Sequence, residues 1–144
     1  MSSDAQEIAE ELRLAIARLV RRTRAEADEM PRSRAETLAR LEAEGAQTIA
    51  QLAEHRAVRH QAMSRSVAEL EELGLVLREP SPTDARAFLI RISDEGRRAL
   101  DRGRRARRTV LASAIAEHLD DEDRALLRRV PALLAKLTPE VRRP

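Results

Sequence analysis

The spacing of apolar residues follows a helical period along most of this chain and departs from it in one segment, from Leu75 to Ile92. Before Gly74 the apolar residues recur at steps of three and four, which is typical of amphipathic helices. From Leu75 to Ile92 they form a short run and then alternate with other residues, as in a β-strand. A turn-rich stretch at residues 79–84 separates the run from the alternation. The pattern therefore predicts a mainly α fold that contains one small β-hairpin.

Four helices are expected before the hairpin, and capping residues and helix breakers set their limits. They cover residues 4–29; 33–44, with Ser33 as N-cap and Glu36 at the capping-box position; 49–55, with Thr48 as N-cap; and 59–73, with Gly74 as the stop. A very short third helix and a tight turn before the fourth predict a helix-turn-helix.

Two more helices are expected after the hairpin. They are a long helix that Ser93 caps and that continues to about His118, and a last helix over 122–137 with Asp120 and Asp123 as caps and a kink at Pro131. The first and last helices of the chain each carry an apolar stripe, formed by Ile8, Leu12, Ile16 and Leu19 and by Leu126, Val130, Leu133 and Leu137. These stripes pack either on each other within one chain or on a second copy.

Composition limits the class of protein. A chain of 144 residues is one domain's worth, and a hydrophobic fraction of 42% is enough to close a core. There is no cysteine, which excludes disulfides and thiolate metal sites. No apolar run approaches the ~20 residues that cross a bilayer, and the acidic start MSSDAQEIAEE is unlike a signal peptide. We therefore expect a cytoplasmic protein with no membrane partner.

Charge is nearly balanced overall and uneven along the chain. There are 27 basic and 25 acidic residues, and the basic ones gather at 55–65 and 97–108 whereas 117–123 is acidic. Basic patches suit a polyanion partner, although an arginine-rich coding bias gives the same runs. Phe88 is the single aromatic residue, so the aromatic platforms that hold single-stranded bases are missing. Double-stranded DNA is therefore the better candidate among nucleic acids.

The short third helix, the turn, the fourth helix and the hairpin together match a winged helix-turn-helix. In that arrangement one helix end enters the ~12 Å wide major groove, and a basic hairpin reaches a neighbouring groove. The fourth helix opens with RHQAMSR, residues 59–65, in which every outward side chain can donate hydrogen bonds. No acidic residue follows until Glu69. The alternative is a solvated basic face without a ligand.

Three segments carry a resemblance to a known family. They are IAQLAE at 49–54, the stretch 63–76 with MSRSV and LEELGLV, and DAR at 84–86 leading to LIRISDEG at 89–96. In these residues the chain resembles the multiple antibiotic resistance regulator (MarR) family of bacterial transcription factors, over roughly residues 12–137. The Asp-x-Arg of the wing, followed by a strand that ends at Ser93, is the most specific part of the resemblance.

The resemblance implies a single winged-helix protein with a DNA-binding lobe at about 33–93 and a dimerisation lobe formed by about 4–30 and 94–138. It implies a homodimer that acts as a sequence-specific double-stranded DNA-binding transcriptional regulator, a ligand-responsive repressor on a pseudo-palindromic operator. The effector implied is a small aromatic or phenolic molecule, and the sequence does not indicate its pocket residues. The alternatives are a winged-helix interaction module or anti-regulator without DNA binding, and a different dimeric winged-helix family.

The site residues that the resemblance implies fall on three elements. The major-groove face of the recognition helix matches Arg59, His60, Gln61, Ser64 and Arg65; the phosphate-touching start of the preceding helix matches Gln47 and Thr48; and the wing matches Arg78, Asp84 and Arg86. We expect the Asp84 carboxylate to orient the Arg86 guanidinium through a charge-assisted hydrogen bond. Arg59 stands where a serine or similar cap is usual, so the sequence leaves open whether it caps the helix or contacts DNA.

Neither a catalytic nor a metal site is expected. His55 and His60 are five residues apart and do not form an i, i+4 pair, and His118 lies far along the chain. The sequence contains no Gly-rich phosphate loop and no recognisable Ser-His-Asp arrangement. It therefore predicts a protein that is not an enzyme and uses no cofactor.

Overall fold

The computed structural model describes residues 3–138 and has the mainly α composition with one hairpin that the sequence predicts. Its elements are α1 (Ser3–Ala27), α2 (Arg32–Glu44), α3 (Ile49–His55), α4 (His60–Glu72), β1 (Val76–Pro80), β2 (Phe88–Ile92), α5 (Asp94–His118), α6 (Asp121–Leu127) and α7 (Val130–Leu137). Among these, no helix is both long enough and apolar enough to cross a membrane.

Contacts along the chain group into two compact units, and the boundary falls within α5. The first unit ends at Arg107 and holds α1–α4, the hairpin and the first part of α5; the second starts at Arg108 and holds the rest of α5 with α6 and α7. The division into a DNA-binding lobe and a dimerisation lobe, which has other limits, stays a prediction.

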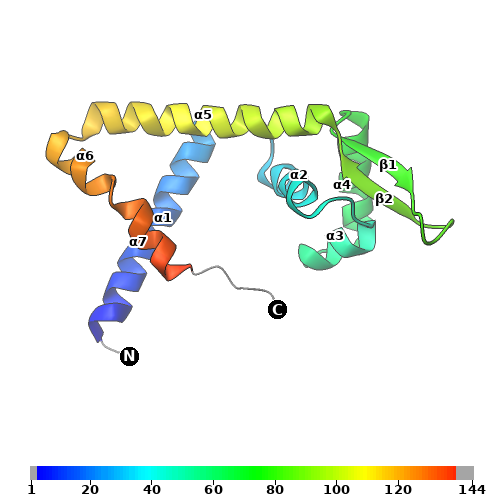
Figure 1. The fold of residues 1–144 in the computed structure, drawn as a ribbon, viewed down its shortest axis with the longest axis horizontal. Coiled ribbons are helices and arrows are strands. Elements are labelled where there is room, and N and C mark those ends of the chain that lie inside the picture. Colours follow the sequence, from blue (N-terminus) through cyan, green and yellow to red (C-terminus); the bar gives the residue numbers. More distant parts are fainter. Residues whose placement is uncertain (1–2, 139–144) are drawn as a thin grey trace. The chain divides into compact units, whose positions relative to one another are not determined.

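The core of the first unit lies among α2, α3, α4 and the β1–β2 hairpin, which group together beside the start of α5 (Figure 1). Leu38 of α2, Val67 and Leu70 of α4 and Ile90 of β2 are all 0% exposed. Each such side chain contributes roughly 1.5–3 kcal/mol when fully buried. The core also contains Leu41, Leu52, Ala53, Met63, Leu75, Val76, Ile92 and Leu100. This cluster holds the helix-turn-helix and the hairpin as one packed body.

The hairpin is antiparallel, with Val76 opposite Ile92 and Pro80 opposite Phe88. A third segment joins it, because the Gln47 N–H donates to the Ile90 carbonyl at 3.0 Å and the Ile90 N–H donates to the Gln47 carbonyl at 2.7 Å. This bridge fixes the start of α3 against the wing. The sequence pattern did not predict it, since a single paired residue has no periodicity.

The start of α5 is joined to the turn between α4 and β1. The Ser93 hydroxyl donates to the Gly74 carbonyl at 2.6 Å and accepts the Gly96 N–H at 3.0 Å. The Ser93 N–H donates to the Leu75 carbonyl at 3.0 Å. Ser93 is therefore the N-cap of α5, as predicted, and it also links α5 to the end of α4.

The expected N-cap of α2, Ser33, is wrong by two residues. The helix begins at Arg32, and Pro31 occupies the N-cap position with φ −54° and no side-chain hydrogen bond. Proline presets a φ that suits entry into a helix, so the serine cap is not needed. Glu36 pairs with Arg32 at 2.6 Å instead of closing a capping box on Ser33. That hydrogen bond from Arg32 lowers the pKa of Glu36, with a smaller contribution from the nearby Arg56 charge.

The last predicted helix is two helices, α6 and α7. The Asp120 side chain accepts the Asp123 N–H at 2.8 Å, so Asp120 is the N-cap of α6 and Asp123 is its donor partner, not a second cap. Pro131 lies in the first turn of α7. A proline has no N–H for the carbonyl four residues earlier, and the chain therefore breaks before Pro131 where a kink was expected.

The turn between α3 and α4 contains a backbone conformation that costs stability. Ala57 has φ 51°, in the left-handed region. The turn is closed by hydrogen bonds from the Ala57 N–H to the Glu54 carbonyl at 3.1 Å and from the Val58 N–H to the Ala53 carbonyl at 3.0 Å. Because these bonds hold the turn, Ala57 keeps a conformation that glycine adopts at no steric cost.

We expect Ala57→Gly to raise the free energy of unfolding by about 0.5–1 kcal/mol, since the steric cost exceeds the added backbone entropy. Urea unfolding of the two proteins measures the difference. The matched control is Ala50→Gly in α3, where the residue is helical and the same change should lower stability by roughly 0.5–1 kcal/mol. Equal losses in both variants would show that the turn is not strained.

Candidate nucleic-acid interface

The recognition helix α4 is held in place by a capped and tethered α3. The Thr48 hydroxyl accepts the Gln51 N–H at 3.1 Å, and the Gln51 side chain accepts the Thr48 N–H at 2.9 Å, which is a complete capping box. At the other end, the Arg56 guanidinium donates to the Ser33 carbonyl and lies 3.3 Å from a Glu36 oxygen. Thr48 is thus the predicted N-cap, and the turn into α4 is fixed from both sides.

One face of α4 is buried and the other is open. Met63, Val67 and Leu70 enter the core at steps of four and three. On the opposite face, His60, Gln61 and Arg65 are exposed and Ser64 is half-buried. Steps of four place His60 with Ser64 and Gln61 with Arg65, so these donors form one surface. The helix therefore presents the donor face that the sequence predicts.

Arg59 occupies the N-cap position of α4. Its backbone is extended, with φ −68° and ψ 145°, and its side chain makes no capping hydrogen bond. Its carbonyl accepts the Met63 N–H at 3.1 Å, which is the first bond of the helix. The position is a cap in backbone geometry only, and the exposed guanidinium is left available for another partner.

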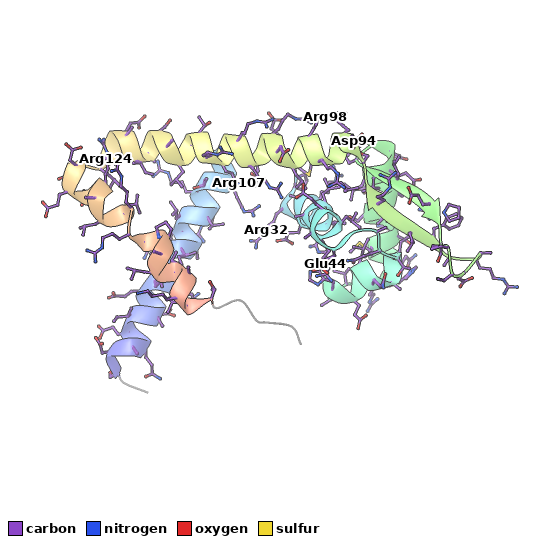
Figure 2. The ribbon with its side chains drawn as sticks, viewed as in Figure 1. Arg32, Glu44, Asp94, Arg98, Arg107 and Arg124 are labelled. Carbon is purple, nitrogen blue, oxygen red and sulfur yellow. The ribbon has the colours of Figure 1, made fainter. Side chains whose placement is uncertain are left out.

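Three arginines on this side of the first unit have no carboxylate partner. Within residues 32–92, Arg59, Arg65 and Arg86 make no ion pair, whereas Arg32 at the start of α2 (Figure 2) is paired with Glu36 at 2.6 Å. The other pairs of the helix-turn-helix and the wing include Arg34–Glu69, Arg56–Glu36, Arg78–Glu71 and Arg91–Glu79. A phosphate would meet uncommitted guanidinium groups at these three positions.

The two residues expected to touch phosphate before α3 also have structural partners. Gln47 is only 8% exposed, and its backbone N–H and carbonyl are both engaged by Ile90. The Thr48 hydroxyl is engaged in the capping box. These bonds make both residues supports for α3, and their contact with phosphate stays a prediction.

The wing loop contradicts the expected ion pair between Asp84 and Arg86. The Asp84 carboxylate accepts the Arg86 backbone N–H at 2.9 Å, not its guanidinium. The Asp84 carbonyl also accepts the Ala87 N–H at 3.0 Å, so Asp84 shapes the turn. A carboxylate two residues before an amide closes this Asx-type turn locally, which competes with reaching the longer guanidinium. Arg86 is exposed near the tip with its charge unpaired among the described residues.

Arg78 connects the wing to the recognition helix. Its guanidinium lies 5.6 Å from the centre of the Phe88 ring and 3.4 Å from a Glu71 oxygen of α4. The contact over an aromatic face is a cation–π interaction. Arg78 is therefore more strongly held than Arg59, Arg65 or Arg86.

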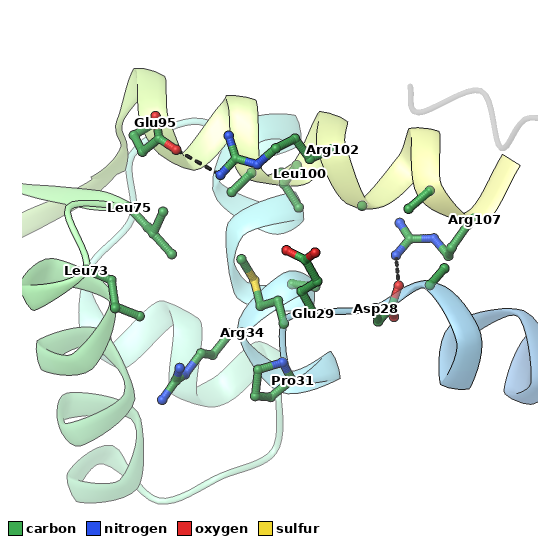
Figure 3. Close-up of a pocket in the computed structure, with 16 residues that line it drawn as sticks. Asp28, Glu29, Pro31, Arg34, Leu73, Leu75, Glu95, Leu100, Arg102 and Arg107 are labelled. Carbon is green, nitrogen blue, oxygen red and sulfur yellow. Dashed lines mark hydrogen bonds and ion pairs between the residues drawn. The ribbon is translucent and has the colours of Figure 1, made fainter. Parts of the chain in front are cut away.

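A second concave region lies beside α5, also within the first unit. This cavity of about 480 Å³ lies among the α1–α2 connection, the end of α4 and the first part of α5 (Figure 3). Its lining includes Met30, Leu73, Leu75 and Leu100 as apolar groups and Asp28, Glu29, Arg34, Glu95, Arg102 and Arg107 as charged groups. The hydrogen bonds from Arg102 and, to a smaller extent, Arg98 lower the pKa of Glu95. The size is that of a site for a small organic molecule.

No group of three His, Cys, Asp or Glu side chains suited to a metal ion occurs among residues 3–138.

Comparison with known proteins decides the family. Residues 29–87 match the MarR family model. The HTH-type transcriptional regulator ML2140 of Mycobacterium leprae strain TN, described as uncharacterized, is 35% identical over 142 residues, which cover 97% of this chain and 98% of that protein. The chain belongs to the MarR family. The HTH-type transcriptional regulator MT0903.1 of Mycobacterium tuberculosis strain CDC 1551 is 36% identical over the same length.

Solved structures agree with the MarR assignment of the fold. A Pseudomonas aeruginosa PA01 protein aligns with a TM-score of 0.81 at 30% identity, covering 96% of this chain and 99% of that one. A MarR family protein from Bacillus stearothermophilus aligns with a TM-score of 0.69 at 23% identity and covers 96% of this chain and 99% of its own. The winged-helix fold predicted from the sequence is therefore confirmed.

Proposed function

We propose that this MarR-family chain is a homodimeric, sequence-specific repressor that binds double-stranded DNA through α4 and the wing and responds to a small ligand. The observation that carries the proposal is the set of uncommitted arginines, Arg59, Arg65 and Arg86, beside the exposed donors of α4. Free guanidinium groups bind phosphate or guanine without first breaking an ion pair. Among the solved relatives of the fold, a MepR mutant from S. aureus is bound to an oligodeoxyribonucleotide. We place the action of the protein in the cytoplasm, with the DNA.

Binding of a labelled duplex tests this proposal. A duplex selected from a random pool should bind, by fluorescence anisotropy, at least about 10³-fold tighter than random duplex at physiological salt. Its half-sites should lie about one helical turn, ~10 base pairs, apart. Equal affinity for selected and random duplex, or none at low salt, would instead favour a winged-helix interaction module without DNA binding.

The dimer is supported by apolar side chains that neither unit covers by itself. Leu126, Leu133 and Leu137 of the second unit are 56%, 53% and 67% exposed, and Ile8 of α1 is 55% exposed. Such stripes are buried when a second copy packs on them. Analytical ultracentrifugation should show a dimer at micromolar concentration, shifted toward monomer by Leu133→Glu and unaffected by Ala43→Glu on α2. A wild-type monomer would contradict the dimer.

We expect Arg86→Ala to weaken operator binding about 10-fold, since an exposed guanidinium at the wing tip suits a narrow minor groove. Asp84→Ala should weaken binding less, because it loosens the turn that carries Arg86 while leaving the guanidinium in place. Anisotropy at one salt concentration measures both effects, and thermal unfolding separates them from lost stability. Equal affinity of wild type and Arg86→Ala for operators with A·T-rich flanks would remove the wing from DNA recognition.

A further inference from the structure

We propose that the cavity beside α5 takes an aromatic cation, with the Glu29 carboxylate as its charge partner, and that an occupant acts on α4 through the Arg34–Glu69 ion pair. This inference rests on the ligand response proposed above. The ligand's charge is then opposite to that of a phenolic anion, and the Arg34–Glu69 pair connects the cavity to the DNA-binding surface of α4.

The cavity offers an apolar floor for an aromatic body. Met30 follows α1, Leu73 and Leu75 come from the end of α4 and the turn after it, and Leu100 comes from α5. Leu73 is 54% exposed although it is a large apolar residue. Covering such surface with an apolar ligand is favourable. A volume of about 480 Å³ fits a molecule with one or two rings.

The arginines that line the cavity are already bound to carboxylates. Arg107 donates to Asp28 at 2.5 Å, and Arg102 donates to Glu95 at 2.9 Å (Figure 3). Arg34 donates to Glu69 of α4 at 2.7 Å. An anion that entered would therefore compete with three existing ion pairs and would face the carboxylates that form them. The arginines give little reason for the cavity to prefer an anion.

Two of the acidic residues each bind a second arginine from outside the lining. Arg24 of α1 lies 3.2 Å from the second carboxylate oxygen of Asp28. Arg98, which lies on the side of α5 away from α2 (Figure 2), binds the second oxygen of Glu95 at 3.0 Å. Asp28 and Glu95 thus each have two arginine partners and no oxygen free for a ligand cation.

Glu29, which is exposed to solvent at the edge of the cavity, is the exception among the charged lining residues. It follows α1 in the connection to α2, and Figure 3 shows its carboxylate in the space between this connection and α5. Within residues 3–138 no arginine, lysine or histidine pairs with it. The aromatic body of a ligand would cover Met30 and Leu73. Its cationic group could then pair with the Glu29 carboxylate without first breaking an existing ion pair. The uncommitted charge therefore sets the preference.

The same cavity touches the recognition helix at two points. Leu73 is the C-cap of α4, and Arg34 of α2 holds Glu69, one turn before that end. A ligand that displaces Leu73 or the Arg34 side chain changes how the end of α4 is held, and α4 carries Arg65 on the DNA side. Because a ligand shifts a conformational equilibrium only by its differential affinity, DNA and cation should weaken each other's binding by the same factor.

A charge series with one apolar body tests the preference. Isothermal titration of the full chain would use 3-phenylpropyl-trimethylammonium, 3-phenylpropan-1-ol and 3-phenylpropionate. The cation should bind roughly five- to tenfold tighter than the anion, as one partly solvated ion pair allows. Glu29→Gln should abolish this preference and leave the alcohol unchanged. Glu44→Gln, at the far end of α2, is the matched control and should keep the preference.

The route to α4 is tested with Glu69→Gln, which breaks the pair with Arg34 and leaves the guanidinium of this lining residue unpaired. In wild type the cation should weaken duplex binding, and in Glu69→Gln a concentration of the cation that saturates the cavity should weaken duplex binding less. Equal or tighter binding of the anion, no binding of the cation at millimolar concentration, or the same loss in Glu44→Gln as in Glu29→Gln would overturn the proposal. The titrations need no DNA, so failure of duplex binding would refute the proposed function separately.

Discussion

Gly96→Ala should lower the free energy of unfolding by at least about 3 kcal/mol, the largest loss expected from adding one methyl group to this chain. A Cβ atom at position 96 would lie 2.2 Å from the Leu75 carbonyl oxygen and 2.7 Å from Cγ1 of Ile92. Neither neighbour moves easily, because Ile92 is 1% exposed and the Leu75 carbonyl accepts the Ser93 N–H at 3.0 Å. Relief would require α5 to move away from the turn that follows α4.

Gly103 in the same helix provides the matched control. A Cβ atom there would meet only the guanidinium of Arg107, at 3.5 Å, which is an ordinary van der Waals distance. Alanine is favoured over glycine inside a helix by about 1 kcal/mol, so Gly103→Ala should be neutral or stabilising. Urea unfolding of both variants gives the comparison, and duplex binding by Gly96→Ala should fall with the folded fraction. A Gly96→Ala protein within about 0.5 kcal/mol of wild type would show that α5 does not press on this turn.

The sequence was sufficient to predict the local structure where a residue has one favourable local hydrogen-bonding role. Thr48, Ser93 and Asp120 are side-chain caps that stand just before helices, and each accepts an N–H three residues on. The alternation around Ile90 and Ile92 likewise predicted a strand with one buried face. In these cases the local pattern and the tertiary packing favour the same structure.

The sequence was insufficient to predict the local structure where two nearby residues or groups can fill the same role. Ser33 and Pro31 both suit the start of a helix, and the proline is the one used. The Asp84 carboxylate can accept a hydrogen bond from either the backbone N–H or the guanidinium of Arg86. The nearer backbone N–H is the one that donates to it. In each case the winning partner is closer along the chain and costs less side-chain entropy to engage.

The remaining features depend on contacts across the fold. Gln47 pairs with Ile90 across more than forty positions in sequence, and no pattern around Gln47 indicates this. The cavity lining comes from three separate stretches, so Glu29 has no local signal as a ligand partner. Charge gave one useful indication, because the basic run at 55–65 contains Arg59 and Arg65, two of the three arginines within residues 32–92 that make no ion pair.

Arg65→Ala should weaken operator binding by about 1–3 kcal/mol if the guanidinium binds a guanine edge, with relaxed preference at one base pair. Arg65 is exposed, lies one turn into α4 and shares a face with Gln61, so it is placed to enter the major groove. If it binds a phosphate instead, the loss should be similar for all duplexes, and the slope of log affinity against log salt should fall by about one.

Arg65→Lys separates these two outcomes, because lysine keeps the charge and loses the planar pair of donors that matches guanine. A base contact predicts that Arg65→Lys behaves like Arg65→Ala at the preferred position, whereas a phosphate contact predicts that it behaves like wild type. Arg105→Ala, which removes an exposed arginine of α5, is the control for net charge and should change affinity little. Anisotropy titrations of the four proteins at several salt concentrations make the comparison, and wild-type affinity and salt slope in Arg65→Ala would exclude Arg65 from the DNA interface.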